Sequence, residues 1–327
     1  IRQTQQTDQS SKVTLTKKFT YINTAGREVK ATGKQAAFTL MFYPYGKGNA
    51  KGAKPVSLTG ENGSYTYSSA PGEGTAVTKI KNNAETGGII ISGLPWGYYG
   101  IIETETAAGF RLETKELYFE IINNEDMEVV YSFGDNADND NGVLSNTAIQ
   151  FQAVKYEERT TTPVSGIRLQ ICGKNTDGTR GDVVTDALNG NAAYEWDTKA
   201  APETIYNLPA GTYLLHEDIK GSTNLNYAIA EEDVEFTVSE DGKIEGTADS
   251  IVKMYDETIK LEIAKVDQFD EAVANATIQM TGTSTNYSET GTTTADNNIL
   301  SFGNLQRNGE YILTENAAPD AEHLAIR

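Results

Sequence analysis

A short sequence pattern, G-x-Y-x-[IL]-x-E, occurs three times in this chain of 327 residues. It reads GYYGIIE at 97–103, GTYLLHE at 211–217 and GEYILTE at 309–315. Because alternate residues of a β-strand face the same side, the tyrosine, the aliphatic residue and the glutamate of each copy share one face. A strand packs its apolar face into a core, so each glutamate is expected to be buried. Three copies at domain-sized intervals predict three tandem units of one fold.

A lysine occupies a matching position near the start of each unit. The sequence VTLTK ends at Lys17, FQAVK ends at Lys155, and LEIAK ends at Lys265. Each lysine is in phase with two apolar residues of its strand, as Lys17 is with Val13 and Leu15. The three lysines are therefore expected to lie on apolar faces, as the glutamates do.

The last strand of each of the first two units carries an amide or an acid on the same face as its apolar residues. GVLSNT places Asn146 in phase with Leu144, and IVKMYDET places Asp256 in phase with Met254. Each of these two polar residues precedes the lysine of the next unit by the same interval, which predicts that one unit's last strand runs directly into the next unit's first. The third unit ends soon after its glutamate, so its closing strand and its acceptor are expected to be missing from this chain.

The segments between these signatures alternate apolar and polar residues, and none forms a long amphipathic helical pattern. The expected fold class is all-β, with Ig-like antiparallel β-sandwiches in series. The first unit is predicted at 1–149, with a long insertion rich in Gly, Ser and Lys at about 44–86. The second is predicted at 150–258, and the third at 259–327, truncated before its last strand.

Composition narrows the classes of function. The chain has 46 acidic and 27 basic residues and a net charge of -19, which argues against nucleic acid and anionic membrane as partners. A single cysteine, Cys172, and two histidines argue against a disulfide framework, a multi-cysteine zinc site, a His-rich metal site and a Ser-His-Asp triad. No apolar run is long enough to span a membrane, and no cofactor is expected. The chain begins without a signal peptide and is interpreted as an internal fragment of a longer protein.

The three signatures together resemble the CnaB-type, or SpaA-like, domains of Gram-positive surface proteins, pilins and adhesins. The glutamate box of that family reads roughly Y-x-L-x-E-x-x-A-P-x-G-Y. The first copy fits the box at Tyr99, Ile101, Glu103, Gly109 and Phe110, the third fits it at Tyr311, Leu313, Glu315, Ala318 and Pro319, and the second keeps Tyr213, Leu215 and Glu217 without the Ala-Pro pair. The resemblance covers nearly the whole chain.

The resemblance implies a spontaneous isopeptide bond inside each complete unit. The implied bonds join Lys17 to Asn146 and Lys155 to Asp256, and the implied catalytic groups are Glu103 and Glu217. Lys265 and Glu315 are the equivalents in the third unit, without an acceptor in the chain.

Elementary chemistry supports such a bond, since burial lowers the pKa of an amine and raises that of a carboxyl group. The neutral lysine can then act as a nucleophile, and the neutral glutamate can polarise the acceptor carbonyl and relay protons. An asparagine acceptor would release ammonia and an aspartic acid acceptor would release water. The residues alone also allow a buried ion pair without a bond.

The function implied is structural. The chain would be a stalk or pilus-shaft segment of an extracellular, cell-wall-anchored surface protein, with neighbouring domains or other pilus subunits as partners. Each site would react once, so the chain is not expected to be an enzyme.

The alternative is an adhesin that binds a host extracellular-matrix or cell-surface ligand through the 44–86 insertion or its loop tips. One loop candidate is the RGD tripeptide at 180–182.

Overall fold

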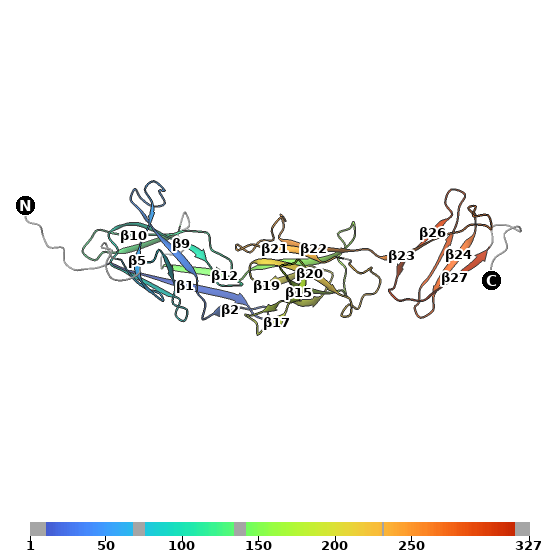
Figure 1. Cartoon of the computed structure of the whole chain (residues 1–327), viewed down its shortest axis with the longest axis horizontal. Helices are drawn as coiled ribbons and strands as arrows, with labels where there is room; N and C mark the ends of the chain where they lie inside the picture. The colour runs from blue at the N-terminus through green and yellow to red at the C-terminus, as the bar shows by residue number, and fades with distance from the viewer. Residues whose placement is uncertain (1–10, 68–75, 134–141, 231, 318–327) are drawn as a thin grey trace, which may run out of the picture.

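The computed structural model describes residues 11–67, 76–133, 142–230 and 232–317. Within these ranges the chain forms β-strands and no α-helix, so none of the described segments is a helix that could cross a membrane. Three β-sandwich units follow one another along an elongated molecule, with unit one and unit three at its opposite ends (Figure 1). Each unit has its own cluster of buried apolar residues. The tandem Ig-like, all-β class predicted from the sequence is confirmed.

Unit one packs two six-stranded sheets against each other. The first sheet has the order β12-β1-β8-β6-β5 with β2 beside β1, and the second has the order β11-β10-β9-β3-β4 with β7 beside β3. The strands outside the insertion are β1 (Lys12–Ile22), β2 (Glu28–Ala31), β3 (Ala37–Tyr43), β8 (Gly88–Ser92), β9 (Gly97–Glu105), β10 (Leu117–Ile121), β11 (Val129–Phe133) and β12 (Val143–Thr147). Alternation along β1 and β9 directs one apolar face of each into the core, as the period-2 pattern requires.

The described parts of the 44–86 segment are built into the sandwich of unit one. They form β4 (Lys54–Pro55), β5 (Leu58–Glu61), β6 (Ser64–Tyr67) and β7 (Lys79–Lys81), which extend both sheets. Leu58, Tyr65 and Ile80 from this segment belong to the apolar core. The segment therefore has a structural role, which its loop-like composition concealed.

Units two and three use the same arrangement with fewer strands. Unit two has sheets β19-β13-β22 and β15-β14-β20-β21, with β18 beside β14 and a separate β16-β17 pair. Its strands are β13 (Gln150–Glu157), β14 (Arg168–Lys174), β15 (Arg180–Val183), β16 (Thr185–Asp186), β17 (Ala192–Ala193), β18 (Glu195–Asp197), β19 (Glu203–Tyr206), β20 (Gly211–Asp218), β21 (Val234–Val238) and β22 (Ile251–Asp256). Unit three has sheets β23-β26 and β25-β24-β27. Its strands are β23 (Ile259–Ala264), β24 (Thr277–Gly282), β25 (Ser288–Thr292), β26 (Ile299–Leu305) and β27 (Tyr311–Ala317).

The first and last strands of units one and two pair in parallel, which differs from the purely antiparallel sandwiches expected from the sequence. β1 pairs with β12 so that Lys17 lies opposite Leu144, and β13 pairs with β22 so that Lys155 lies opposite Met254. The chain must leave each unit in the direction in which it entered, because the last strand continues into the next unit. This register places the acceptor two residues beyond the partner of the lysine, on the same face of the sheet.

Units one and two meet at a joint held by side-chain amides. Asn189 and Asn207 of unit two both donate to the carbonyl of Ile22 at the end of β1, at 2.9 and 2.8 Å. Asp186 accepts hydrogen bonds from both of these amides, at 2.8 Å each. Leu188 packs against the apolar core of unit one. The joint is therefore a specific contact between two folded units.

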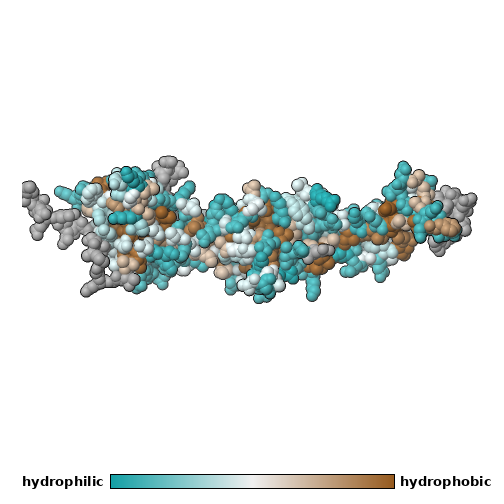
Figure 2. All heavy atoms as spheres, turned by 45° about the horizontal axis from the view of Figure 1, so that its top comes forward, coloured by the Kyte–Doolittle hydropathy of each residue, from teal (hydrophilic) through white to brown (hydrophobic). Residues whose placement is uncertain are grey.

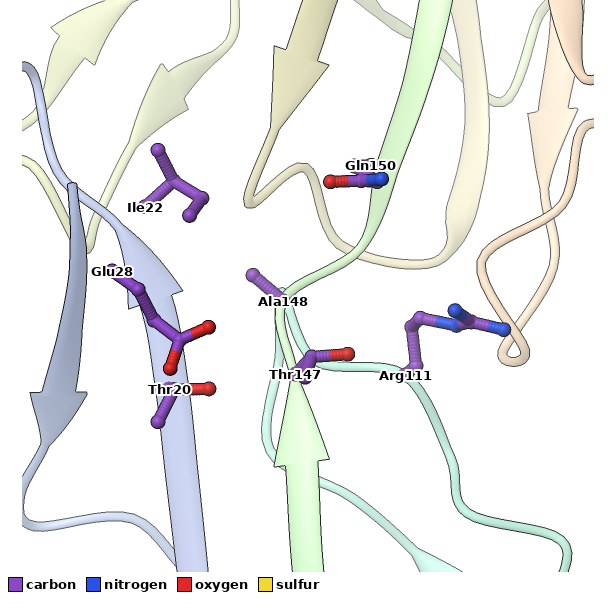
Figure 3. Close-up of a pocket in the computed structure, with 7 residues that line it drawn as sticks. All are labelled: Thr20, Ile22, Glu28, Arg111, Thr147, Ala148 and Gln150. Atoms are coloured by element: carbon purple, nitrogen blue, oxygen red, sulfur yellow. The ribbon is translucent and has the colours of Figure 1, made fainter. Parts of the chain in front are cut away.

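The glycine of the first glutamate box lies at this joint. Gly109 has a φ of 86°, and a Cβ there would come within 2.7 Å of the Asn207 carbonyl oxygen, so a side chain would clash. A small pocket beside it is lined by residues of both units, among them Glu28, Arg111 and Gln150 (Figure 3). The Arg111 side chain extends toward the neighbouring loop of unit two and donates to the Asp241 carbonyl at 2.9 Å.

Candidate functional site

Three polar residues meet in the apolar core of unit one. Lys17 comes from β1, Glu103 from β9 and Asn146 from β12, and all three are buried. They approach from both sheets, because β1 and β12 lie in one sheet and β9 lies in the facing one. The structure thus brings together the three side chains of unit one that the sequence analysis selected.

Glu103 contacts both of the other groups. Its Oε2 accepts a hydrogen bond from the Lys17 Nζ at 2.9 Å, and its Oε1 accepts one from the Asn146 Nδ2 at 2.7 Å. The Lys17 Nζ also donates to the Asn146 Oδ1. A fourth residue, Thr106, accepts a hydrogen bond from the Asn146 Nδ2 at 2.7 Å. The amine therefore lies against the amide carbonyl, and the carboxyl group bridges the amine and the amide nitrogen.

Burial shifts the ionisation of both charged groups of unit one toward their neutral forms. Desolvation lowers the pKa of the Lys17 amine, although the nearby Glu103 opposes this shift. Desolvation likewise raises the pKa of the Glu103 carboxyl group, against the opposing effects of Lys17 and Asn146. The rings of Phe19 and Phe38 lie 5.2 and 5.4 Å from the Lys17 Nζ and help to exclude water from it. A neutral amine beside a neutral carboxyl group is the combination that amide-bond formation requires.

Unit two places its three selected residues in the same way. Lys155 on β13, Glu217 on β20 and Asp256 on β22 are all buried. The Lys155 Nζ lies 2.9 Å from the Glu217 Oε2 and 2.6 Å from the Asp256 Oδ1. The acceptor here is a carboxyl group, so its charge state decides its reactivity.

Burial shifts the ionisation of the Asp256 carboxyl group toward its neutral form. Its pKa is raised to about 6, first by desolvation and then by the charge of Glu217 and a hydrogen bond with it, while Lys155 opposes the shift. Among the described residues, the Glu217 Oε1 and the Asp256 Oδ2 have no other hydrogen-bond partner. A proton shared between the two carboxyl groups would satisfy both oxygens. Asp256 can therefore be protonated in the folded chain at mildly acidic pH.

Unit three holds only part of this arrangement. The Lys265 Nζ lies 3.5 Å from the Glu315 Oε2, so the predicted pair is brought together. The lysine side chain is 21% exposed, whereas those of Lys17 and Lys155 are 0% exposed. No acceptor from the described residues contacts this lysine.

Sequence reasoning missed some of the groups around these sites. Thr106 gives no periodic signal, because it follows the end of β9, and only the fold brings it to Asn146.

The arginine of the RGD tripeptide lies in β15, where Arg180 binds Asp233 at 2.9 Å and contacts His216, so it is engaged within the unit. Cys172 is a buried residue of β14. No cluster of His, Cys, Asp and Glu side chains suited to a metal ion occurs in the described ranges.

Comparison with solved structures finds matches at low sequence identity. The Bacillus anthracis TIE protein matches with 18% identity over 95% of this chain and 46% of its own, at a TM-score of 0.38. A streptococcal ancillary pilin matches with 19% identity over 77% of this chain and 63% of its own, at a TM-score of 0.29. The major pilin T-13 of Streptococcus pyogenes matches with 13% identity over 77% of this chain and all of its own, at a TM-score of 0.29. This chain spans about half the length of the TIE chain. No curated protein matches the sequence.

Comparison with protein families finds the SpaA prealbumin-like fold domain. The family profile matches residues 34–136 and 259–325, which together make up about half of the chain. The matched ranges contain the first and third glutamate boxes, the two copies that retain the most of the pattern. The all-β sandwiches, the glutamate boxes and this match lead to one conclusion: the chain belongs to the family of SpaA prealbumin-like fold domains.

Proposed function

We propose that this chain is a structural segment of a bacterial surface stalk or pilus shaft, and that its first two units close themselves with intramolecular isopeptide bonds. The observation that carries the proposal is a contact that occurs twice. In both units a buried lysine amine lies against a buried amide or acid of the last strand, with a carboxyl group beside it.

The geometry of unit one supports a proton relay through Glu103. The Lys17 Nζ attacks the Cγ of Asn146, and the Glu103 Oε2, which already accepts a hydrogen bond from Nζ, receives the proton. The Oε1 of the same carboxyl group faces the Asn146 Nδ2 and returns a proton to it, so that ammonia leaves. Thr106 holds the departing nitrogen. Folding keeps the reacting groups together, which can contribute roughly 7–11 kcal/mol toward lowering the barrier.

Unit two is proposed to follow the same course with a different leaving group. The Lys155 Nζ attacks the Cγ of protonated Asp256, the Cγ–OH bond breaks, and water leaves. Glu217 passes the proton from the amine to the departing hydroxyl group. Because the site is consumed by its own reaction, it has no turnover.

The proposed bonds would connect the strand that enters each unit with the strand that leaves it. A pulling force along the chain would then act on the covalent bridge between the parallel strands instead of separating the sheets. The expected gain is resistance to force, heat and proteolysis, which is kinetic stability. A chain with one cysteine cannot obtain this from an internal disulfide.

Intact-mass measurement of the purified chain in denaturant tests the proposal. The expected mass is that of the sequence less one ammonia and one water, and fragment analysis should join Lys17 to Asn146 and Lys155 to Asp256. The variant Glu103→Ala should regain the ammonia and still lack the water, because unit two keeps its own carboxyl group. The unreduced mass of the sequence would reject both bonds and leave only buried ion pairs.

A further inference from the structure

A short segment that follows the glutamate strand of each complete unit runs along the linker to the next unit. We call this segment the strap; it is residues 109–113 in unit one and residues 226–230 in unit two. The linkers are residues 147–149 and 257–259, which come directly after the acceptors Asn146 and Asp256. A strap that binds its linker therefore also fixes the end of the last strand, where the acceptor lies.

In unit one the strap binds the linker through two backbone hydrogen bonds. The Ile149 N–H donates to the Gly109 carbonyl at 2.9 Å, and the Arg111 N–H donates to the Thr147 carbonyl at 3.0 Å. Phe110, which lies between the two bonds, is buried in the core of unit one. The strap is thus anchored both to the linker and to the core.

In unit two the strap binds its linker in the same register. The Ile259 N–H donates to the Asn226 carbonyl at 3.0 Å, and the Ala228 N–H donates to the Glu257 carbonyl at 2.8 Å. Tyr227, between the two bonds, packs against the core of unit two. The pair at 226–227 therefore takes the place of the Gly-Phe pair at 109–110, although the second glutamate box has lost most of its pattern.

The last residue of each strap reaches the glutamate of the site. In unit two the Ala230 N–H donates at 3.3 Å to the Glu217 Oε2, the oxygen that also accepts a hydrogen bond from the Lys155 Nζ. In unit one the corresponding residue is Glu113, whose backbone forms a hydrogen bond with the Glu103 carboxyl group. Each strap thus helps to orient the carboxyl group that relays protons in the proposed reaction.

The strap of unit one also binds the following unit. The Arg111 Nε donates to the Asp241 carbonyl of unit two at 2.9 Å, and the Leu112 N–H donates to the Glu240 carbonyl at 2.8 Å. One five-residue segment therefore contacts the site, the linker and the neighbouring unit.

Unit two repeats this contact at its joint with unit three. The Asn226 Nδ2 donates to the Asn304 carbonyl at 2.9 Å. Arg307 of unit three donates from its backbone N–H to the Leu225 carbonyl at 2.8 Å and from its Nη2 to the Asn224 carbonyl at 3.1 Å. The other two nitrogens of this guanidinium group are also buried. Figure 2 shows a continuous surface across both joints.

We propose that each strap couples the docking of the following unit to the crosslinking of the unit before it. The proposal rests on the proposed function of the first two units. A docked neighbour holds the strap against the linker, so that the acceptor and the glutamate stay in their reacting positions. Without that contact the reacting geometry is populated for a smaller fraction of the time, and the bond forms more slowly.

The coupling assigns roles to residues that lie outside the unit that reacts. Arg307 belongs to unit three and is a positioning residue for the bond between Lys155 and Asp256. Asn189 belongs to unit two, binds the end of β1 and supports the bond of unit one. Each unit would therefore close fully only after its C-terminal neighbour has folded and docked.

Refolding kinetics of the whole chain test the coupling. The chain is produced and kept in denaturant so that it starts without crosslinks, and the two joined fragments are quantified over time after dilution. Arg307→Ala should slow the bond of unit two by about threefold to tenfold, the effect of one lost hydrogen bond at the joint. The bond of unit one, formed in the same molecules, should keep its rate, and the final mass should not change.

Further variants separate positioning from a simple loss of stability. Asn226→Ala removes a bond of the same joint from the side of unit two and should reproduce the slowing. Asn189→Ala should slow unit one and spare unit two, although the altered residue is part of unit two. Gln306→Ala is the matched control, because Gln306 precedes Arg307 and its backbone bonds within unit three.

The outcomes distinguish the coupling from the proposed function. Slowing confined to the unit before the altered joint supports the coupling. Unchanged rates in the Arg307 and Asn189 variants, or slowing of the unit that carries the substitution, overturn it even when the unaltered chain shows both mass deficits. If the unaltered chain shows neither deficit, the proposed function fails and the coupling fails with it.

Discussion

Units two and three carry the same lysine and glutamate signatures but place them in different environments. Lys155 and Glu217 have side chains that are 0% and 2% exposed, whereas those of Lys265 and Glu315 are 21% and 9% exposed. The pair is also looser in unit three, 3.5 Å against 2.9 Å. The difference lies in the last strand, since β22 covers the lysine of unit two and none of the described strands does so in unit three. The last strand of unit two therefore brings more than the acceptor, because it also buries the lysine and the glutamate.

The largest effect is expected from a substitution that disrupts the last strand of unit two. Met254→Asp puts a charge at a buried position of β22, which costs several kcal/mol by order of magnitude. We expect it to open unit two, expose Lys155 and abolish the loss of water in the intact mass. The control is Tyr255→Asp on the same strand, because Tyr255 is exposed and faces the other side. A normal crosslink in the Met254 variant would show that burial by β22 is unnecessary.

The second test removes the bond and keeps the strand. Lys17→Met removes the amine and fills the buried position with an apolar side chain, so unit one should resemble an uncrosslinked sandwich. A crosslink that closes a loop on the order of 100 residues stabilises by about 4–5 kcal/mol in the chain-entropy description, so a loss of that size is expected. Stepwise thermal or chemical unfolding, with proteolysis to identify the unit that opens, measures it. Unit two should keep its transition, and an unchanged unit one would argue that no bond had formed there.

The third test separates the two complete units by their acceptors. In the proposed reaction Asp256 must be the neutral acid. Its pKa is raised to about 6, so the reactive fraction would fall about tenfold for each pH unit above that value. Asn146 does not titrate, so unit one lacks this loss. The chain is produced and kept in denaturant, so that it starts without crosslinks, and is then refolded at pH values below and above 6. The fragments that join Lys17 to Asn146 and Lys155 to Asp256 are quantified over time. Asp256→Asn should remove the pH dependence of unit two, and equal pH profiles for the two units would contradict this account.

The smallest effect is expected at Thr106, which accepts a hydrogen bond from the Asn146 Nδ2, the nitrogen that would leave in the proposed reaction. Thr106→Val keeps the shape of the side chain and removes one hydrogen-bond acceptor, which corresponds to about 0.5–1.5 kcal/mol. Bond formation in unit one should slow by a few-fold during refolding, and the final mass should not change. The rate in unit two provides the internal control. A rate in unit one that stays equal to wild type would show that Thr106 only fills space.

The repeat could be predicted from the sequence because strand periodicity is a strong local signal. A lysine and a glutamate in phase with apolar residues, such as Lys17 with Leu15 and Glu103 with Ile101, already indicate where the side chains point. The partners from other strands could not be predicted in this way. Thr106 reaches Asn146 through the turn after β9, and the parallel register of β1 and β12 depends on the path of the whole chain.

Composition did not predict which loop-like segments contribute to the core or to the joint between units. The 44–86 segment is rich in small and charged residues, yet Leu58 and Ile80 from it belong to the core. The joint between units one and two was likewise hidden, because Asn189 and Asn207 lie in segments that have the composition of ordinary loops. Only the folded chain shows that these amides bind the end of β1.

The parallel pairing of β1 with β12 has a consequence for damage to the backbone. If Lys17 and Asn146 are joined, the peptide chain between them forms a closed ring, and the neighbouring units are attached to that ring at the two bridged residues. A single cut anywhere within the ring would open it without parting the molecule. A fibre made of such units would stay continuous after nicks in its surface loops, including any in the 44–86 segment.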